Sequence, residues 1–317
     1  MRRWMIAVVV PFVLWGCIDH VPDNPVYHAR EKLLFLQEND HRPDEPDESI
    51  VLMDAQTGDT VTIDQQRYLS DPRLSPSGSR ILYRCENLDL DLWAGIRGTR
   101  QNYQMRLVDM AALTNTRIGA TLAEPEYGFR MVDWLTDSTL VIGTGGVTNK
   151  LYLLDLVADT IGVFKTFHQF DRIWLDRVSP DGRSVIIHFP THFQGFAVWR
   201  IGEEEAHIVI DSVLAALFHS WSPDNNEILY VRDWKDTLIM CRYDMRTGKT
   251  YDFGYPDVVP QTIGGLEYTP SGDMLIQTYL DHDPRGFLYR YDSQRQVSRV
   301  LSRDSVFRSA LQYRGNG

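Results

Sequence analysis

The stretch "RVSPDGRSVIIHF", residues 177–189, combines the end of one predicted β-strand, a tight turn and the start of a second strand. In the turn, Ser179 can hydrogen-bond to the local backbone, Pro180 fixes φ, and Gly182 accommodates a positive φ. The residues that follow are rich in Val and Ile, which is typical of a strand. Whether this hairpin occurs once or repeatedly decides the fold class, because a fixed repeat indicates a repeat architecture.

The hairpin pattern recurs along the chain. Four further copies are "RLSPSGSRILYRC" (73–85), "DWLTDSTLVIG" (133–143), "SWSPDNNEILYVR" (220–232) and "EYTPSGDMLIQTY" (267–279). The second turn residues of the five copies lie 60, 44, 43 and 47 residues apart, and an insertion at 87–102 explains the longest interval. A period of about 44 residues is that of a β-propeller blade.

A second pair of strands accompanies the repeated hairpins. Each of these pairs has a strand ending in Asp, a short turn and another strand, and the aspartates are Asp54, Asp109, Asp155, Asp244 and Asp292. We expect each carboxylate to accept backbone N–H groups in its turn. One unit, residues 196–210, has no Asp at this position. Two strand pairs give four antiparallel strands per unit, as in a propeller blade.

The two chain ends together supply a sixth unit. Residues 32–37 and 49–63 provide three strands but no innermost strand, and the C-terminal "VFRSALQYRGNG" (306–317) resembles the innermost strand at 265–272. We therefore predict an all-β fold: a six-bladed β-propeller with four antiparallel strands per blade and blade one closed by the C-terminal strand. Sharing a blade between the termini leaves no open sheet edge in the ring.

The "SPDG" turns and the "LYxxD" strands resemble the WD40-like repeats of the TolB-type six-bladed propellers over residues 30–317. The resemblance implies the propeller fold. It implies little about activity, because one fold can support many functions.

The N-terminal segment "MRRWMIAVVVPFVLWGC" has the anatomy of a signal peptide, with Arg2 and Arg3 before an apolar run and Gly16 before Cys17. The apolar run is short for a membrane span of about 20 residues. "LWGC" resembles a bacterial lipobox, which implies cleavage before Cys17 and lipid on that residue. An ordinary secretory signal and an uncleaved anchor remain alternatives. The predicted divisions are a signal peptide (1–16), a lipid-anchored tether (17–29) and a propeller domain (30–317).

The lipobox resemblance predicts an exported protein that is anchored in the bacterial cell envelope. Ile18 stands where Asp would retain a lipoprotein at the inner membrane, which favours the outer membrane, facing the periplasm. The net charge of -11 disfavours nucleic acid as a partner. We expect a monomer that binds a protein or an envelope component. Cys85 and Cys241 fall in blades on opposite sides of the ring, so we predict two buried, free thiols.

The connections between the second and third strands are long and varied, whereas the inner turns are short and regular. Because variable loops on a rigid scaffold commonly bind ligands, we predict a binding face on the long-loop side. The candidate residues on this face are Trp93, His192, Trp234, Asp281 and His282. In "HFPTH", we expect His188 and His192 to form a surface pair. We predict no metal and no cofactor.

The central channel is the alternative site. Asp133, Asp176, His219 and Glu267 occupy innermost strands and could point inward, although irregular alternation leaves their direction open. A hydrolase or lyase with a metal or polar site in the channel is therefore one alternative, and a carbohydrate- or peptide-binding module is another. The chain has no G-x-S-x-G, H-E-x-x-H or P-loop motif. The sequence thus favours a non-enzymatic interaction scaffold without catalytic residues.

Overall fold

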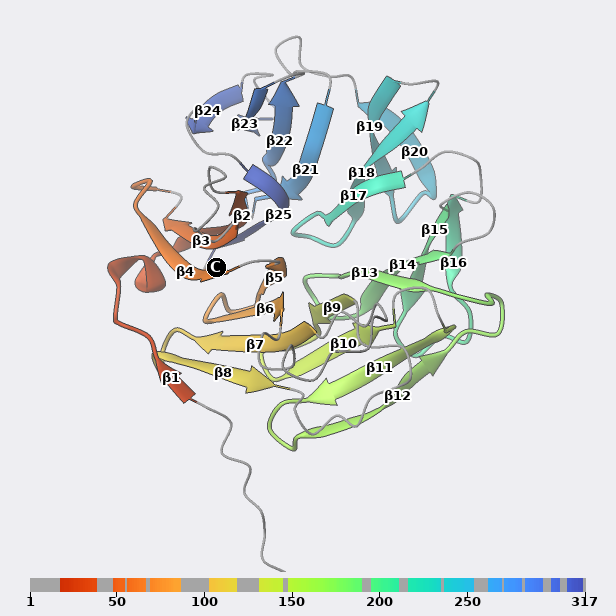
Figure 1. Ribbon diagram of the computed structural model, residues 1–317. Coiled ribbons are helices and arrows are strands. Elements are labelled where there is room, and N and C mark those ends of the chain that lie inside the picture. Colours follow the sequence, from red (N-terminus) through yellow and green to blue (C-terminus); the bar gives the residue numbers. More distant parts are fainter. Residues whose placement is uncertain are drawn as a thin grey trace, which may run out of the picture.

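The computed structural model describes residues 18–38, 48–54, 56–66, 69–86, 103–118, 131–144, 148–189, 195–210, 216–234, 237–253, 262–269, 271–280, 283–292, 298–302 and 307–315. Over these ranges the chain forms six antiparallel sheets arranged in a ring around a central axis (Figure 1). One short 3-10 helix, η1 (Pro25–His28), accompanies them. No helix within these ranges has the length and apolar character needed to cross a membrane. The predicted six-bladed propeller is confirmed.

Each blade has four strands, which run in order from the innermost to the outermost. Blade one contains β25 (Phe307–Gly315), β2 (Glu31–Glu38), β3 (Glu48–Asp54) and β4 (Thr60–Gln66). Blade two contains β5 (Ser70–Leu74), β6 (Arg80–Glu86), β7 (Tyr103–Asp109) and β8 (Thr114–Ile118). Blade three contains β9 (Met131–Trp134), β10 (Thr139–Gly143), β11 (Lys150–Asp155) and β12 (Thr160–Thr166).

The other half of the ring follows the same order. Blade four contains β13 (Trp174–Val178), β14 (Ser184–Phe189), β15 (Gly195–Arg200) and β16 (His207–Ile210). Blade five contains β17 (Ala216–Trp221), β18 (Glu227–Trp234), β19 (Thr237–Asp244) and β20 (Lys249–Phe253). Blade six contains β21 (Thr262–Tyr268), β22 (Met274–Leu280), β23 (Asp283–Tyr291) and β24 (Ser298–Ser302).

The C-terminal strand closes the ring. β25 pairs antiparallel with β2, from Glu31 opposite Gly315 to Gln37 opposite Phe307. Strands from the two ends of the chain therefore lie in one sheet, as predicted, and backbone hydrogen bonds join them within blade one.

The turn residues act as the sequence predicts. In blade four, Ser179 Oγ accepts a hydrogen bond from the Ser184 N–H at 2.9 Å, and Gly182 has φ +68°. A Cβ on Gly182 would lie 2.9 Å from the Leu135 carbonyl oxygen, so this glycine also permits close contact with blade three. In the outer turn of blade three, Asp155 Oδ1 accepts the backbone N–H groups of two turn residues at 2.8 and 2.9 Å.

The inner and outer turns of a blade lie on the same face of the ring. The Ile201 N–H at the outer turn of blade four donates to the Arg183 carbonyl at the inner turn, at 2.9 Å. Leu156 makes the equivalent bond to Ser138 in blade three, also at 2.9 Å. The connections between the second and third strands must therefore leave from the opposite face.

The packing between blades is apolar. Clusters of buried Leu, Ile, Val and aromatic side chains join blade one to blade two, blade three to blade four, and blade four to blade five. Cys85 and Cys241 are buried and neither forms a disulfide, as predicted. Burial raises the pKa of the Cys241 thiol to about 11, so this residue acts as a small apolar side chain at neutral pH.

Part of the segment predicted to be a tether lies against the propeller. β1 (Ile18–His20) pairs with β8 and adds a short fifth strand to the outer edge of blade two (Figure 1). Further along, Asn24 caps η1 by accepting the Val26 N–H, and Val26 and Tyr27 are buried between blades one and two. The chain therefore contacts the ring from the residue that directly follows Cys17.

Candidate functional site in the central channel

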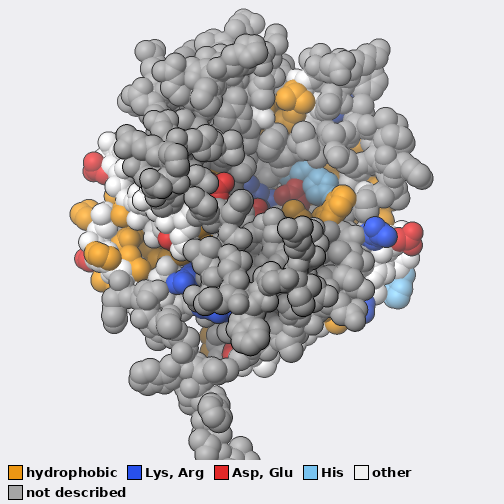
Figure 2. Space-filling model, viewed as in Figure 1, with side chains coloured by type: hydrophobic (Ala, Val, Ile, Leu, Met, Phe, Trp, Pro, Cys, Tyr) orange, Lys and Arg blue, Asp and Glu red, His pale blue; other side chains and the backbone are white. Residues whose placement is uncertain are grey.

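The innermost strands of the six blades surround the centre of the ring (Figure 1). Figure 2 shows basic, acidic and histidine side chains side by side in the hollow at this centre. We call the residues that interact there the channel cluster: Asp133, Asp176, Arg177, His188, His219 and Glu267.

Two β-bulges change the direction of the Asp176 and His219 side chains in the channel cluster. In β13 the pairing with β14 shifts between Leu175 and Arg177, so Asp176 is the extra residue. In β17 the pairing with β18 shifts between Leu217 and Ser220, and His219 lies within that shift. Because a bulge changes the direction of the side chain it carries, it allows residues that strict alternation would turn away to face the same centre.

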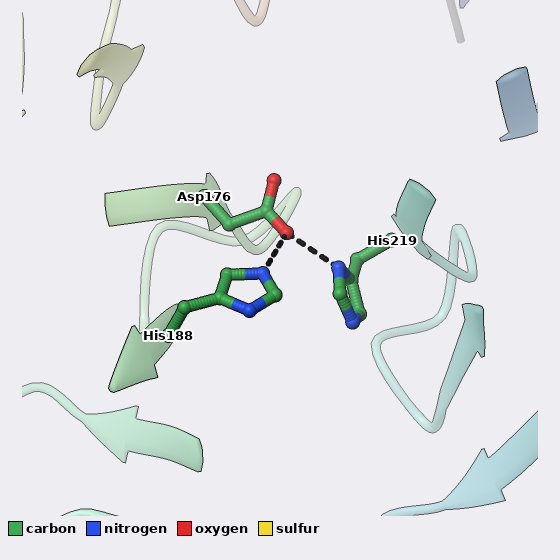
Figure 3. Close-up of side chains that lie close together, drawn as sticks. All are labelled: Asp176, His188 and His219. Carbon is green, nitrogen blue, oxygen red and sulfur yellow. Dashed lines mark hydrogen bonds and ion pairs between the residues drawn. The ribbon is translucent and has the colours of Figure 1, made fainter. Parts of the chain in front are cut away.

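Asp176 joins the two histidines of the cluster. Its Oδ2 lies 3.0 Å from His188 Nε2, with which it shares a hydrogen bond, and 2.5 Å from His219 Nδ1 (Figure 3). The His219 contact is close but lacks hydrogen-bond geometry. Both ring nitrogens of His219 are buried without a hydrogen-bond partner among the described residues. The same Asp176 oxygen therefore contacts a ring nitrogen of both His188 and His219.

Aromatic rings hold His219 in place. Its ring is stacked over Tyr230 at 6.1 Å between centroids and lies 4.6 Å from the ring of Phe196. Only 1% of the His219 side chain is exposed. These neighbours come from β15 and β18, so the interface between blades four and five fixes the ring before any ligand arrives.

Burial and charge set the protonation of this pair. Burial lowers the pKa of His219, and this effect outweighs the attraction of Asp176. For Asp176, burial alone would raise the pKa, but contacts with His219 and His188 hold it well below the usual value. At neutral pH we therefore describe Asp176 as a carboxylate beside a neutral His219.

A salt bridge spans non-adjacent blades in the channel. Arg177 Nη1 of blade four lies 2.9 Å from Glu267 Oε2 of blade six. Burial would lower the pKa of Arg177, but the charges of Glu267, then Asp133 and Asp176, raise it overall. Asp133 links blades three and four by accepting the Val178 N–H at 2.7 Å. The cluster thus contains three carboxylates and one guanidinium, which makes it negative.

Comparison with solved structures supports the fold assignment. TolB from Acinetobacter baumannii matches with a TM-score of 0.65 and 15% identity, over 87% of this chain and 65% of that one. A TolB structure from Agrobacterium tumefaciens matches with a TM-score of 0.60 and 14% identity, over 87% and 91% of the two chains. This chain has a TolB-like six-bladed propeller fold. It spans less than two thirds of the length of the Acinetobacter protein.

A third solved structure differs from this TolB-like propeller in ring closure. The β-propeller domain of the Trilobed protease from Pyrococcus furiosus has an open velcro topology and matches with a TM-score of 0.50 and 16% identity, over 87% and 80% of the chains. In the present propeller, β25 and β2 pair. No family model matches the sequence, and no curated protein matches it.

The TolB-like ring brings the four predicted channel residues together. Asp133, Asp176, His219 and Glu267 all belong to the channel cluster, although their functional role stays a prediction. Sequence reasoning missed Arg177 and assigned His188 to the surface. That assignment is wrong, because His188 is on β14, is mostly buried and faces Asp176.

The predicted binding-face residues are almost entirely outside the described part of the propeller. Cys17, Trp93, His192, Asp281 and His282 lie outside the described residues. Trp234 ends β18, where its backbone pairs with Thr237 of β19. This position places Trp234 at the connection between the second and third strands of blade five, on the predicted face.

Proposed function

We propose that this TolB-like propeller is an exported, lipid-anchored, non-enzymatic scaffold that binds a protein partner in the cell envelope, at the outer membrane facing the periplasm. In this proposal residues 1–16 are a signal peptide, residues 17–29 carry the lipid on Cys17, and residues 30–317 form the interaction domain. The closed ring supports this role, because a rigid disc presents its loops in fixed positions.

The observation that carries the proposal is the position of the channel cluster relative to the two faces. Trp174 at the start of β13 pairs with His188, one residue before β14 ends. The Asp176–His188 pair therefore lies toward the end of blade four from which the 190–194 connection leaves. This pair and the predicted long-loop face are therefore on the same side of the ring, whereas Asp133 and Glu267, each one residue before the end of its strand, lie nearer the inner turns.

The charge of the cluster indicates the chemistry of the partner. With Asp133, Asp176 and Glu267 around Arg177, the channel attracts positive charge. We propose that a segment of the partner carrying Lys or Arg docks at the mouth of the channel. Complementary charge would speed its association and fix its orientation more than it would add affinity.

Site-specific photo-crosslinking in the cell envelope tests which face binds. A photo-reactive p-benzoylphenylalanine replaces Trp234 on the long-loop face in one variant and Val157 in the control. Val157 is 82% exposed in the outer turn of blade three, on the opposite face. We expect a discrete crosslinked partner from position 234 and none from position 157. Crosslinks from position 157 alone, or equal crosslinks from both, would contradict the proposed face.

Metabolic labelling with a radioactive fatty acid tests the anchor separately. We expect label in the wild-type protein and none in the Cys17→Ser variant, which should accumulate as an unlipidated precursor. Cys85→Ser is the matched control and should retain the label. Label that persists in Cys17→Ser would show that the lipid attachment is wrong, without bearing on which face binds a partner.

The Asp176–His188 pair favours one second candidate, a hydrolase or lyase. A carboxylate that orients an imidazole is the arrangement of a general acid or base. Turnover of polysaccharide or peptide substrates that is lost in His188→Gln but kept in His28→Gln would support this candidate. The scaffold proposal predicts no turnover in either protein.

A further inference from the structure

We propose that Asp176, His188 and His219 bind one divalent transition-metal ion of the Zn²⁺ type in the channel. The three residues offer one carboxylate oxygen and two imidazole nitrogens. These ligand atoms all lie within 4.8 Å of one another (Figure 3). The inference goes beyond the scaffold role and does not depend on the lipid anchor. A bound Zn²⁺ would offset the excess negative charge of the channel cluster, so the ion and a cationic partner segment would compete for it.

The distances between the ligand atoms suit a single ion. Zn²⁺ bonds to nitrogen and oxygen at about 2.0–2.2 Å, so two ligands of a tetrahedral site lie about 3.3–3.5 Å apart. Asp176 Oδ2 is 3.0 Å from His188 Nε2 and 2.5 Å from His219 Nδ1. Tetrahedral spacing requires outward shifts of about 1 Å or less in these two distances, and it requires the two histidine nitrogens, which lie within 4.8 Å of one another, to be about as far apart as the other pairs.

The type of ligand selects the class of metal. Two imidazoles and a carboxylate suit Zn²⁺ and the neighbouring transition metals, whereas Ca²⁺ and Mg²⁺ prefer oxygen ligands alone. Three protein ligands leave at least one coordination position for water or a ligand in the channel. We therefore expect Zn²⁺ to bind and Ca²⁺ not to compete.

The state of His219 is an independent observation in favour of the site. Its side chain is almost completely buried, its Nδ1 is in close contact with Asp176 Oδ2 without normal hydrogen-bond geometry, and its Nε2 has no hydrogen-bond partner among the described residues. Buried polar atoms are normally satisfied, so an imidazole without a partner requires an explanation. A metal ion bonded to Nδ1 satisfies that nitrogen. The packing against Tyr230 and Phe196 holds the ring ready for it.

The surrounding charges favour a cation despite a nearby guanidinium. Arg177 directly follows Asp176 in β13 and belongs to the channel cluster, so its charge would repel a metal ion. Arg177 is, however, ion-paired with Glu267 and also interacts with Asp133, so two carboxylates besides the ligand Asp176 oppose its charge. Asp176 and His188 retain 19% and 16% side-chain exposure, which leaves the site open to an entering ion.

Calorimetric titration of Zn²⁺ into the chelator-treated full-length protein tests the proposal, with metal content measured afterwards. We expect one Zn²⁺ per chain in the wild type and an affinity loss of about 100-fold or more in His188→Gln. The matched control is His28→Gln. His28 pairs with Asp23 at the same 3.0 Å distance, but on the surface and without a third ligand in the described part of the chain. Loss of binding in His188→Gln with retention in His28→Gln supports the site.

Two further measurements, the absorption spectrum of bound Co²⁺ and the melting temperature with Zn²⁺, test the site even if the variant folds less well than the wild type. We expect Co²⁺ to give the visible absorption of a tetrahedral site in the wild type and to lose it in His188→Gln. We also expect Zn²⁺ to raise the melting temperature of the wild type and of His28→Gln but not of His188→Gln. Sub-stoichiometric binding to the wild type, an unchanged affinity in His188→Gln, or equal competition by Ca²⁺ would overturn the proposal.

Discussion

Replacing Asp133 by Ala probes how the channel cluster joins neighbouring blades. Asp133 is buried, and its carboxylate accepts the Trp134 N–H at 2.9 Å and the Val178 N–H at 2.7 Å. Val178 belongs to blade four, so the second bond crosses the interface between blades. Ala would leave both donors without this acceptor in a place that water reaches poorly.

The magnitude follows from the two lost bonds. A hydrogen bond to a charged group contributes about 1.5–3 kcal/mol, and a buried donor left unsatisfied costs a similar amount. We expect Asp133→Ala to lower the free energy of unfolding by about 3–5 kcal/mol. The matched control is Asp155→Ala, which also removes two backbone hydrogen bonds, of 2.8 and 2.9 Å, but in an exposed turn. Because water can replace them there, we expect a loss of about 1 kcal/mol.

Urea denaturation followed by tryptophan fluorescence measures both variants, with Trp134 next to the substituted residue as one reporter. We expect the midpoint to fall much further for Asp133→Ala than for Asp155→Ala. Equal shifts in the two variants would refute the reasoning, because they would mean that burial between blades adds nothing to the carboxylate's hydrogen bonds.

Three further predictions concern closure, thiols and pH. Deleting residues 307–317 should lower the melting temperature sharply, because β2 loses one of its two partner strands and blade one opens; an unchanged thermal melt would contradict closure by β25. Cys241, whose pKa burial raises to about 11, should not react with a thiol reagent at pH 8 until the protein unfolds, and fast labelling of the folded protein would disprove its burial. Burial raises the pKa of Tyr230 to about 12 and also raises the pKa values of Tyr83 and Tyr268. These groups hold their protons more tightly when folded, so stability should be full below about pH 10 and fall as pH rises above it. Chemical denaturation at pH 8, 10 and 11 checks this, and equal stability at all three would contradict it.

Local turn chemistry explains why the fold could be predicted from the sequence. Ser179, Gly182 and Asp155 each act on backbone groups only a few residues away, so their roles are visible in short stretches. The repeat then gives the number of blades. The pairing of β1 with β8 was not predicted, because a three-residue strand that joins an existing sheet edge carries no periodic signal of its own.

The site could be predicted only in part, because its geometry depends on bulges. In a regular strand, Asp176 and Arg177 would point to opposite faces, yet both belong to the channel cluster. The extra residue in β13 breaks the alternation, which is why the sequence left the direction of Asp176 open. His188 was missed because it lies on the second strand of its blade. The only signal was a lone histidine in the otherwise apolar "VIIHF", residues 185–189.

A crystal structure of the Zn²⁺-loaded protein, with anomalous data collected at the zinc edge, tests the central claim most directly. We predict one anomalous peak in the channel, about 2.0–2.2 Å from Asp176, His188 and His219, inside six blades closed by β25 and β2. A peak bound by other residues, no ordered peak, or a ring in which these two strands do not pair would contradict the claim.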